Sequence, residues 1–590
     1  MEPDEVHRMS LLQLAKKQLF EPDTNLLYNP VIREQQTPQG NPEYSRRGWT
    51  SGRSFMAQCY YPAAPHPRVD TAVTLGTHMI SKGLGWEFHE VEYSVAPPGY
   101  VEWGTNVLKN YSMHLKGSEE NTDYIYGAIY CSLGEYSVSP PLPRALLEHW
   151  DPNTNTFLFP CGERTITLLD MNQMAGLPLD GDLYDEFISP THELDPSLLL
   201  YPNFLPQLLD IWNKHSESGN VGFQEWCDYF HNRLNDTFFI NSLQDERLYT
   251  AAYIAIWLCR FVVPGGGPYI HPGVLVMASW ITIGRRISLA PPALCSLYYS
   301  LWLIHSSHWS LLFEKGMLSP LSDRWMGIYL RKAFGNKSST KSLPFYKHPA
   351  PKPKMWNTMS RTPLFHDHDS AHKLLRQHTQ ISWHPYSLSK LENVGYLSRV
   401  FQISIRRGML PWRRVEEFIA EPYHPDRVAR QFRLDQVVPF PPFTSLYTRH
   451  DIGIAYAFWL HLLRDEEDPR PIPDDSRVGD SSVAWANWLH EFLKPFANVF
   501  DQLRNGNLNG KVPYNERRKN RSALQRHIRV RPLSDENFKV VRRVADDHRD
   551  QHIGVTEQEE ARVKDHWMPI LHSYLQDVAA TQPMKSKEVN

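Results

Sequence analysis

The stretch that decides the fold runs from Arg144 to Asp182 and reads RALLEHWDPNTNTFLFPCGERTITLLDMNQMAGLPLDGD. At its start, Leu146, Leu147 and Trp150 have the spacing of one face of a short helix. The turn-forming Asp151-Pro152-Asn153 follows directly and would end that helix. The first part of the stretch therefore predicts a short helix that closes near Asp151.

The middle of the stretch predicts a β-hairpin. Two short β-favouring runs, 156–159 and 164–167, flank the turn 160–163, which contains Pro160 and Gly162. The hairpin leads into a second helix, because Thr167 and Asp170 have the spacing of a capping box variant. This second helix is expected to end at Ala175, with Gly176 as the residue after it and Pro178 preventing continuation.

Outward from this stretch, the apolar pattern is helical. Residues 223–234 carry an amphipathic face, and 248–263 is apolar nearly all round, as in a central buried helix. Further apolar helices are expected at 274–283 and 294–304, and 485–496 shows a strong amphipathic pattern. The chain is therefore expected to be mainly α, a multi-helix globular domain with a few short β-hairpins and a C-terminal helical extension.

Composition limits the class of protein. Of 590 residues, 62 are Lys or Arg and 65 are Asp or Glu, which gives a net charge of −3 and no global sign of nucleic-acid or membrane binding. The six cysteines include no C-x-x-C pair, which argues against a disulfide scaffold or a cysteine-built zinc site. The uncharged run 287–313 contains Pro291, Pro292 and two histidines, so we expect a buried core helix there and no membrane span.

Breaks in periodicity and shifts in composition divide the chain. We expect a mobile N-terminal arm, a helical core that contains a Pro- and Lys-rich linker or loop, an acidic Pro-rich linker and a C-terminal helical extension. In this order the regions are 1–60, 61–465 with the loop at 335–361, 466–480, and 481–590 with a basic segment at 511–543.

Three ordered blocks carry a family resemblance. The first spans 146–181, the second 278–298 and the third 423–439, which reads YHPDRVARQFRLDQVVP. Together they resemble the plant mobile domain of the maintenance-of-meristems-like proteins, which is found in plant transposons and in host genes derived from them. One departure is Arg433, where the family usually has Gly. The residues that match the family motif are Trp150, Phe157, Pro160, Gly162, Glu163, Thr165, Thr167, Asp170, Gly176, Leu177, Pro178, Arg427, Gln431, Phe432 and Gln436.

The resemblance implies a non-enzymatic nuclear interaction protein. Members resemble proteins linked to transposon silencing, chromatin control, genome integrity and meristem maintenance. They imply nuclear protein partners, among them a PP7-type serine/threonine phosphatase. The family carries no established catalytic residues to transfer. An older label, aminotransferase-like, finds no support here, because no lysine lies in a context typical of a Schiff-base residue, and we expect no cofactor.

Two groups of residues suggest chemistry. His366-Asp367-His368-Asp369, followed by His372, offers ligands for zinc or manganese, and a metal-dependent nuclease or transposase-like enzyme using His366 and His368 is the rival hypothesis. The spacing misses established patterns, so we favour a solvated polar turn. Cys161 and Glu163 suggest a nucleophile and base. No histidine lies beside them in the sequence, and we assign both to the scaffold.

Two further motifs have simpler interpretations. The triplet 265–267 lacks the lysine of a phosphate loop, so we expect a chain reversal there. Arg427 and Arg430 lie three residues apart on an expected short helix. They have the charge to bind phosphate groups, but we favour salt bridges to neighbouring acids.

The strongest local sign of a partner is the basic segment 511–543. It holds eleven Lys or Arg against three acids, a net of +8. Arg517, Arg518, Lys519 and Arg521 resemble a nuclear-import signal, and the segment predicts weak DNA contact through backbone phosphates. A solvated basic face is the alternative. We expect the nucleus as the location, with the cytoplasm as alternative, and a transposon-encoded DNA-binding accessory protein remains a third hypothesis.

Overall fold

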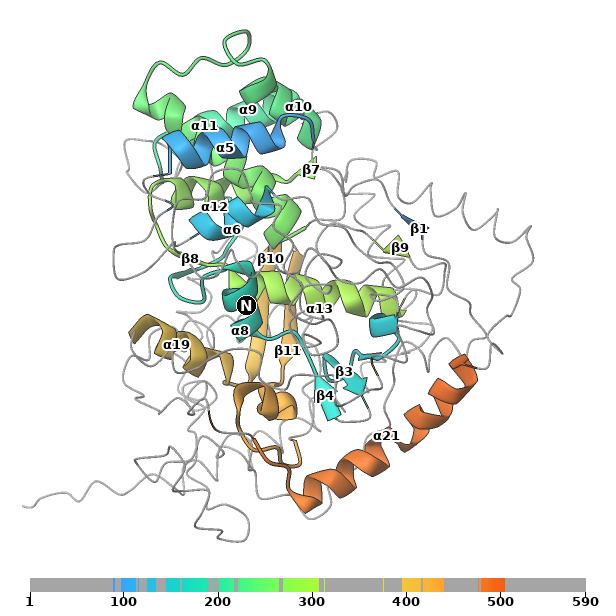
Figure 1. Cartoon of the computed structure of the whole chain (residues 1–590). Coiled ribbons are helices and arrows are strands. Elements are labelled where there is room, and N and C mark those ends of the chain that lie inside the picture. The colour runs from blue at the N-terminus through green and yellow to red at the C-terminus, as the bar shows by residue number, and fades with distance from the viewer. Residues whose placement is uncertain are drawn as a thin grey trace, which may run out of the picture.

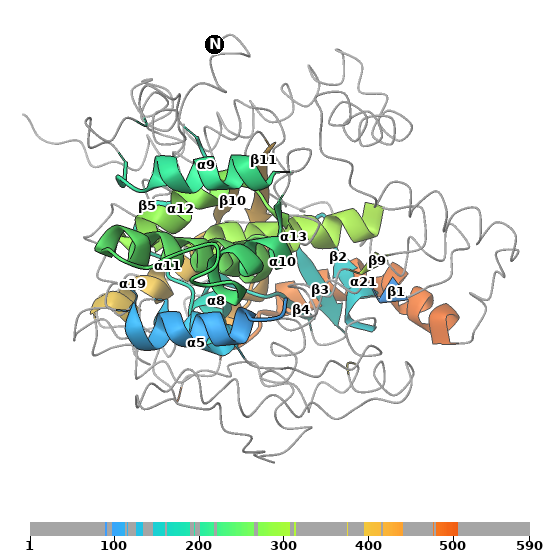
Figure 2. The ribbon, with the colours of Figure 1, turned by 90° about the horizontal axis from the view of Figure 1, so that it is seen from above.

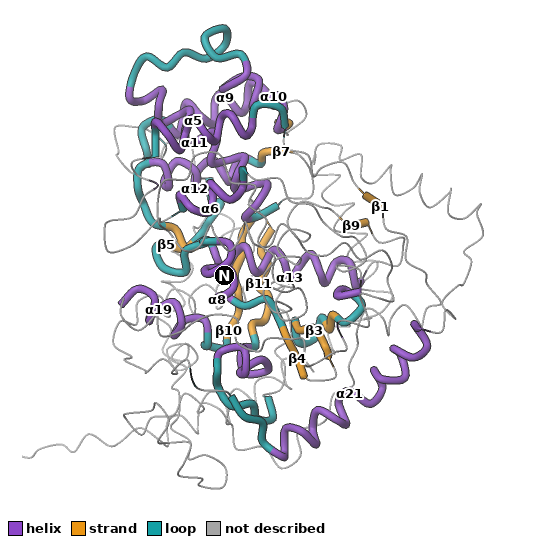
Figure 3. Tube along the Cα trace, in the orientation of Figure 1, coloured by secondary structure: helices purple, strands orange, loops and turns teal. Residues whose placement is uncertain are grey.

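The fold is seen in a computed structural model of the chain, and it is mainly helical, as the sequence predicts (Figure 1). Figure 3 shows strands only as short pieces among the helices, apart from one longer pair. The structure describes the following residues, together with a few isolated positions: 89–90, 97–112, 125–133, 145–159, 162–188, 201–216, 221–264, 269–306, 312–313, 395–414, 417–439 and 479–504.

One half of the molecule is a group of helices around α11 (Leu243–Trp257). Helices α5 (Tyr100–Asn110), α9 (Leu205–His215) and α12 (Pro272–Thr282) all lie against α11. In Figure 2, α5 and α9 lie on opposite sides of α11. Every residue of α11 from Leu248 onward is buried, so the predicted central helix is confirmed.

Two helices, α11 and α10 (Phe223–Cys227), continue into a wider, π-helical turn. Residues Leu258–Val262 (η6) continue α11 as a π-helix, and Asp228–Asn232 (η5) continues α10 in the same way. The predicted amphipathic face from residue 223 is confirmed for Phe223, Trp226 and Phe230, which are buried. The helix stops at residue 232, so Leu234 lies beyond it, in a bridge with Phe238.

The other half is built on α13 (Ala290–Ser306), which crosses the middle of the molecule (Figure 1). Helix α8 (Leu168–Ala175) and the antiparallel pair of β10 (Gly408–Arg414) and β11 (Glu417–Tyr423) pack against it. Helix α19 (Gly395–Ser404) packs on α8. Trp412 of β10 and Phe418 of β11 both lie in this hairpin.

A three-stranded sheet precedes α8. A hairpin forms where it was predicted, as β3 (Thr156–Phe159) and β4 (Gly162–Arg164). The second strand was expected at 164–167 and lies at 162–164, because Gly162 already pairs with Phe159. Strand β2 (Trp150–Asp151) adds a third strand. The prediction that Trp150 lies on a helix is therefore wrong. Trp150 is paired with Phe157 across the sheet, and their ring centroids lie 4.8 Å apart, so cross-strand packing overrides the helical spacing.

Short strand pairs join other parts of the chain. Strand β5 (Asp182–Leu183) pairs in parallel with β8 (Ile287–Ser288), and β6 (Val221–Gly222) pairs antiparallel with β7 (Tyr269–Ile270). Strand β1 (His89–Glu90) pairs in parallel with β9 (Leu312–Phe313).

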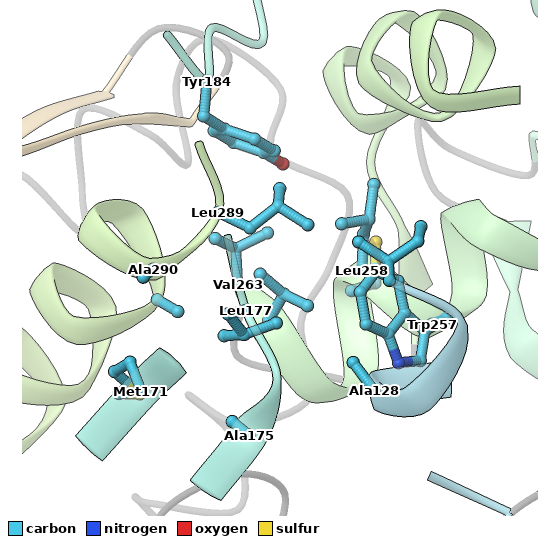
Figure 4. Close-up of a cluster of buried hydrophobic side chains, with 14 of the residues drawn as sticks. Ala128, Met171, Ala175, Leu177, Tyr184, Trp257, Leu258, Val263, Leu289 and Ala290 are labelled. Atoms are coloured by element: carbon cyan, nitrogen blue, oxygen red, sulfur yellow. The ribbon is translucent and has the colours of Figure 1, made fainter. Parts of the chain in front are cut away.

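The ends of α8 are as the sequence predicts. Thr167 accepts a hydrogen bond from the backbone N–H of Asp170, and the Asp170 carboxylate accepts one from the backbone N–H of Thr167, so the capping box is present. Gly176 ends the helix with φ of 68°. Leu177 then enters a buried cluster that includes Met171 and Ala290 (Figure 4).

Two elements complete the described fold. A 3₁₀ segment, η8 (Pro425–Phe432), follows β11, and α21 (Val483–Arg504) forms at the predicted amphipathic pattern. Among the described residues, no helix is long and apolar enough to cross a membrane. The division of the chain into regions stays a prediction, and the arm 1–60, the loop 335–361 and the basic segment 511–543 lie outside the described residues.

Candidate functional site

The candidate site is a buried polar network in which the first and third motif blocks meet. At its centre, the Arg427 Nε donates to Oε1 of Glu163 at 2.8 Å. The same oxygen accepts a hydrogen bond of 2.8 Å from the Thr156 hydroxyl. The two charged side chains are 2% and 0% exposed, so water does not screen this ion pair. Burial raises the pKa of Glu163, and the positive charge of Arg427 opposes that rise.

A second pair of hydrogen bonds runs beside the first. The Gln431 amide oxygen accepts from the backbone N–H of Thr165 at 3.0 Å, and its amide nitrogen donates to the Thr165 carbonyl at 2.9 Å. The Gln431 side chain thus binds both backbone groups of Thr165, the residue after β4, as the backbone of a neighbouring strand would. The Tyr298 hydroxyl of α13 lies 2.9 Å from the Thr165 hydroxyl, so all three blocks of the motif contribute to this point.

The turn between β2 and β3 is also tied to the hairpin of β10 and β11. Asn155 has a left-handed backbone with φ of 53°, a conformation that asparagine tolerates better than most residues. Its side-chain nitrogen donates to the Glu421 carboxylate at 3.2 Å and to the Pro422 carbonyl at 3.0 Å. The turn geometry therefore aims the Asn155 amide at β11.

A second carboxyl lies close to the central ion pair. Asp151 is 1% exposed, and burial raises its pKa to about 7, although the charge of Arg427 and a hydrogen bond from the Asn153 backbone favour the ionised form. The charge of Glu163 adds to the rise. Asp151 is therefore a buried group that changes protonation near neutral pH.

Helix α21 covers the other side of Arg427. The guanidinium carbon lies 5.1 Å from the ring centroid of Trp488 and 5.3 Å from that of Phe492, within the range of cation–π attraction. The two rings are stacked, with centroids 4.8 Å apart. Trp485, Trp488, Leu489 and Phe492 form one buried cluster with Leu158 of β3. Arg427 is thus enclosed between a carboxylate and two aromatic rings.

The N-terminal end of α21 is fixed to the segment that follows η8. The Gln436 backbone N–H donates to the Asp480 carbonyl at 2.6 Å, and the Ser482 N–H donates to the Gln436 carbonyl at 3.0 Å. The Gln436 side chain donates to the Asp426 carbonyl at 2.8 Å. A Cβ at Gly479 would lie 2.1 Å from the Leu434 carbonyl oxygen, so this approach requires glycine.

Other motif residues hold α8 and the segment after it. The Leu168 N–H donates to the Tyr423 hydroxyl at 3.3 Å, which joins the helix start to β11. The Pro178 carbonyl accepts from the Leu289 and Ala290 backbones at 2.9 and 3.0 Å, which fixes the start of α13. Phe432 packs against Phe401 of α19.

The predicted site residues have different outcomes. Arg427 forms a salt bridge, but its partner is Glu163, 264 positions away, and not a neighbouring acid as the sequence had favoured. Arg430 is half-buried. The described motif residues are buried except Gly176, which is half-buried. Pro160, Cys161 and the triplet 265–267 lie outside the described residues, as do His366 and His368, and Arg517, Arg518, Lys519 and Arg521. Within the described part of the chain, no group of three His, Cys, Asp or Glu side chains has an arrangement that could hold a metal.

Sequence reasoning missed part of the network. Asn155, Glu421 and Asp151 carried no signal that separated them from ordinary turn and strand residues. The sequence predicted the aromatic face of α21, but not that this face packs against Leu158 and Arg427. No local pattern paired Arg427 with Glu163 either, because the two residues lie in different motif blocks, 264 positions apart.

This geometry can be compared with known proteins. A model of the plant mobile domain matches residues 124–460, which is more than half of the chain. The chain belongs to the plant mobile domain family. It is similar to two proteins of Arabidopsis thaliana: Protein MAINTENANCE OF MERISTEMS, 49% identical over 49 residues, and Protein MAIN-LIKE 1, 46% identical over 50 residues. Each match covers 8% of this chain and 10% of the relative. No solved structure matches the chain.

Membership locates the network within the plant mobile domain. Glu163, Thr165, Arg427 and Gln431 all fall inside the matched residues, whereas α21 begins after them. Arg433, the departure from the family pattern, keeps the turn that glycine would make, because it adopts a left-handed φ of 62° at the end of η8. The substitution leaves the turn in place.

Proposed function

We propose that this plant mobile domain protein is a non-enzymatic nuclear interaction protein. It would act through protein partners in transposon silencing and chromatin control, and through them in genome integrity and meristem maintenance. The family supports this proposal, and so does the similarity to Protein MAINTENANCE OF MERISTEMS and Protein MAIN-LIKE 1, although each match covers a tenth of the relative.

One observation carries the proposal: the motif side chains point inward. Glu163 and Arg427 bind each other in one buried ion pair, and Thr165 and Gln431 bind each other through two reciprocal hydrogen bonds. Groups that satisfy one another in this way hold distant segments together. The motif residues would then form the scaffold of the domain, and partners would bind to the surface residues that this scaffold holds in place.

The test is affinity purification of the tagged full chain from plant nuclei. The matched control is the Arg427→Ala variant, which removes the central ion pair and with it the scaffold. Partners that depend on the domain should be enriched with the wild-type chain and lost with the variant. Equal capture by both chains, or no capture above an untagged extract, would contradict the proposal.

A PP7-type serine/threonine phosphatase is the partner we propose first. Purified phosphatase and purified full chain should form a complex in size-exclusion chromatography, and the Arg427→Ala variant should not. Separate elution of the two wild-type proteins would reject this partner while leaving other nuclear partners to the purification experiment.

We also propose nuclear import and weak DNA contact through residues 511–543. Deleting 517–521, which removes Arg517, Arg518, Lys519 and Arg521, should reduce nuclear accumulation of a fluorescent fusion. Contact with DNA phosphates should weaken steeply as salt rises, because each neutralised phosphate releases counterions. Unchanged accumulation would reject the import role, and a flat salt response would reject the DNA contact.

A further inference from the structure

Helix α21 packs on the rest of the protein through a hydrophobic cluster of its own. The buried side chains Trp485, Trp488, Leu489 and Phe492 form this cluster with Leu158 of β3, and it is distinct from the main core. The residues that lie between these four in the sequence are exposed, and Figure 1 shows α21 at the edge of the molecule. No described side chain of α21 belongs to the main core, so that core does not depend on α21.

The surface that α21 covers lies within the plant mobile domain. Leu158, Arg427 and the partly buried Val438 fall inside the matched residues 124–460, whereas α21 begins at Val483. We call these three residues the docking face. The backbone bonds to Gln436 hold the start of α21 without involving its aromatic side chains. A helix from outside the domain therefore fills an apolar surface that also carries one cation.

The fit between α21 and the docking face leaves two buried N–H groups unpaired. Among the described residues, neither the Arg427 Nη2 nor the indole nitrogen of Trp485 has a hydrogen-bond acceptor. A buried donor without an acceptor costs free energy, and water would satisfy both donors if α21 moved away. The rings of Trp488 and Phe492 offset part of this cost through cation–π attraction to the guanidinium. A different helix that keeps the two rings and supplies an acceptor would fit the face better than α21.

We propose that the docking face binds an amphipathic helix of a partner protein, and that α21 is the resident helix which this partner displaces. The partner helix that fits has aromatic side chains four positions apart, as Trp488 and Phe492 are, on one apolar face. Helices of this kind bind by laying the apolar face against a hydrophobic surface. The inference rests on the proposed function for the existence of a partner, and it adds which surface the partner contacts.

Competition by α21 gives the proposal a measurable signature. Because α21 is part of the same chain, its effective concentration at the docking face is high. The apparent affinity of any added helix is reduced to the fraction of molecules in which the face is open. Loosening α21 should therefore raise the affinity of the chain for an added helix, whereas a purely structural contact would give no such gain.

The test measures binding of a fluorescein-labelled peptide of residues 479–504 to the full chain by fluorescence anisotropy. The double variant Trp488→Ala with Phe492→Ala loosens the resident helix and leaves the docking face unchanged. It should bind the peptide about tenfold or more tightly than the wild-type chain does. The matched control is Val483→Ala with Asn487→Ala, two exposed positions of the same helix, which should bind as the wild-type chain does.

A third substitution tests the face itself. Leu158→Ala, added to the double variant, removes an apolar contact of the docking face without touching the main core, and it should abolish the gain. Equal affinity of the wild-type chain and the double variant, or a gain that survives Leu158→Ala, would overturn the proposal. Circular dichroism establishes that each variant is folded.

The wild-type chain gives a second readout that needs no variant of the protein. Unlabelled peptide at about millimolar concentration, comparable with the effective concentration of a tethered segment, should increase protease cleavage within α21. A peptide with alanine in place of Trp488 and Phe492 should not, and equal cleavage with both peptides would overturn the proposal. A wild-type chain that elutes as a dimer, but as a monomer with Phe492→Ala, would assign the face to a second copy and also overturn it. None of these experiments uses nuclear extract, so their failure leaves the affinity purification to decide the proposed function.

Discussion

Replacing Arg427 with alanine tests the account of the motif network. The substitution leaves the Glu163 carboxylate buried, with the Thr156 hydroxyl as its remaining side-chain donor at 2.8 Å. Removing one partner of a buried ion pair costs about 3–5 kcal/mol. The attraction to the rings of Trp488 and Phe492 is lost as well, at about 0.5–2 kcal/mol. The total, about 5 kcal/mol, is comparable to the whole stability of many domains.

The assay is urea unfolding of the full chain, followed by tryptophan fluorescence and circular dichroism. The double variant Glu163→Gln with Arg427→Met removes both charges together, so its cost should fall well below the sum of the two single costs. Arg233→Ala is the matched control, since Arg233 is exposed and surface changes cost about 0.5 kcal/mol or less.

The pH dependence gives a second readout of the same variant. A carboxyl whose pKa is higher in the folded chain than in the unfolded chain destabilises the fold above its folded pKa. That cost begins to shrink as the pH falls through the folded pKa and is gone below the lower pKa of the unfolded chain. Without Arg427, the pKa of Glu163 should rise further, so the loss of stability should be larger at pH 8 than at pH 5. A loss below about 1 kcal/mol, or additive costs in the double variant, would refute the reasoning.

Three further substitutions test individual features. Asp151→Asn should stabilise the chain at pH 8 and have little effect at pH 4, because a folded pKa of about 7 makes the ionised carboxylate unfavourable above neutrality; equal effects in urea at both pH values would contradict this. Thr167→Ala should cost about 1–2 kcal/mol and Ser242→Ala, at the more exposed cap of α11, about 1 kcal/mol or less in the same assay. Phe492→Ala should release α21 to limited proteolysis, whereas Val483→Ala, at an exposed position, should not; equal cleavage would argue against the packing of α21.

The parts of the fold that the sequence predicted are those set by near neighbours. The capping box of Thr167 and Asp170 and the glycine end at Gly176 depend on residues within a few positions, and both are present. The central helix α11 was predicted because a helix that is apolar on all sides has to be buried.

The parts that were missed depend on residues far apart in the chain. Trp150 carries a helical spacing, yet it pairs with Phe157 in a strand. The hairpin of β10 and β11 contains Pro411 and charged residues at a spacing that gives no clear period, and its fit against α13 decides its structure. Local patterns also could not select Glu163 as the partner of Arg427, because nothing in either block identifies the other.

The central ion pair has a consequence for how the protein is made. Glu163 and Arg427 are separated by 264 positions. At a synthesis rate of about 5–20 residues per second, Glu163 leaves the ribosome about 13–50 seconds before its partner. During that time the first motif block has a carboxylate without its arginine, and β3 presents Leu158 without the aromatic face of α21. A growing chain in this state is expected to depend on chaperones until η8 and then α21 emerge.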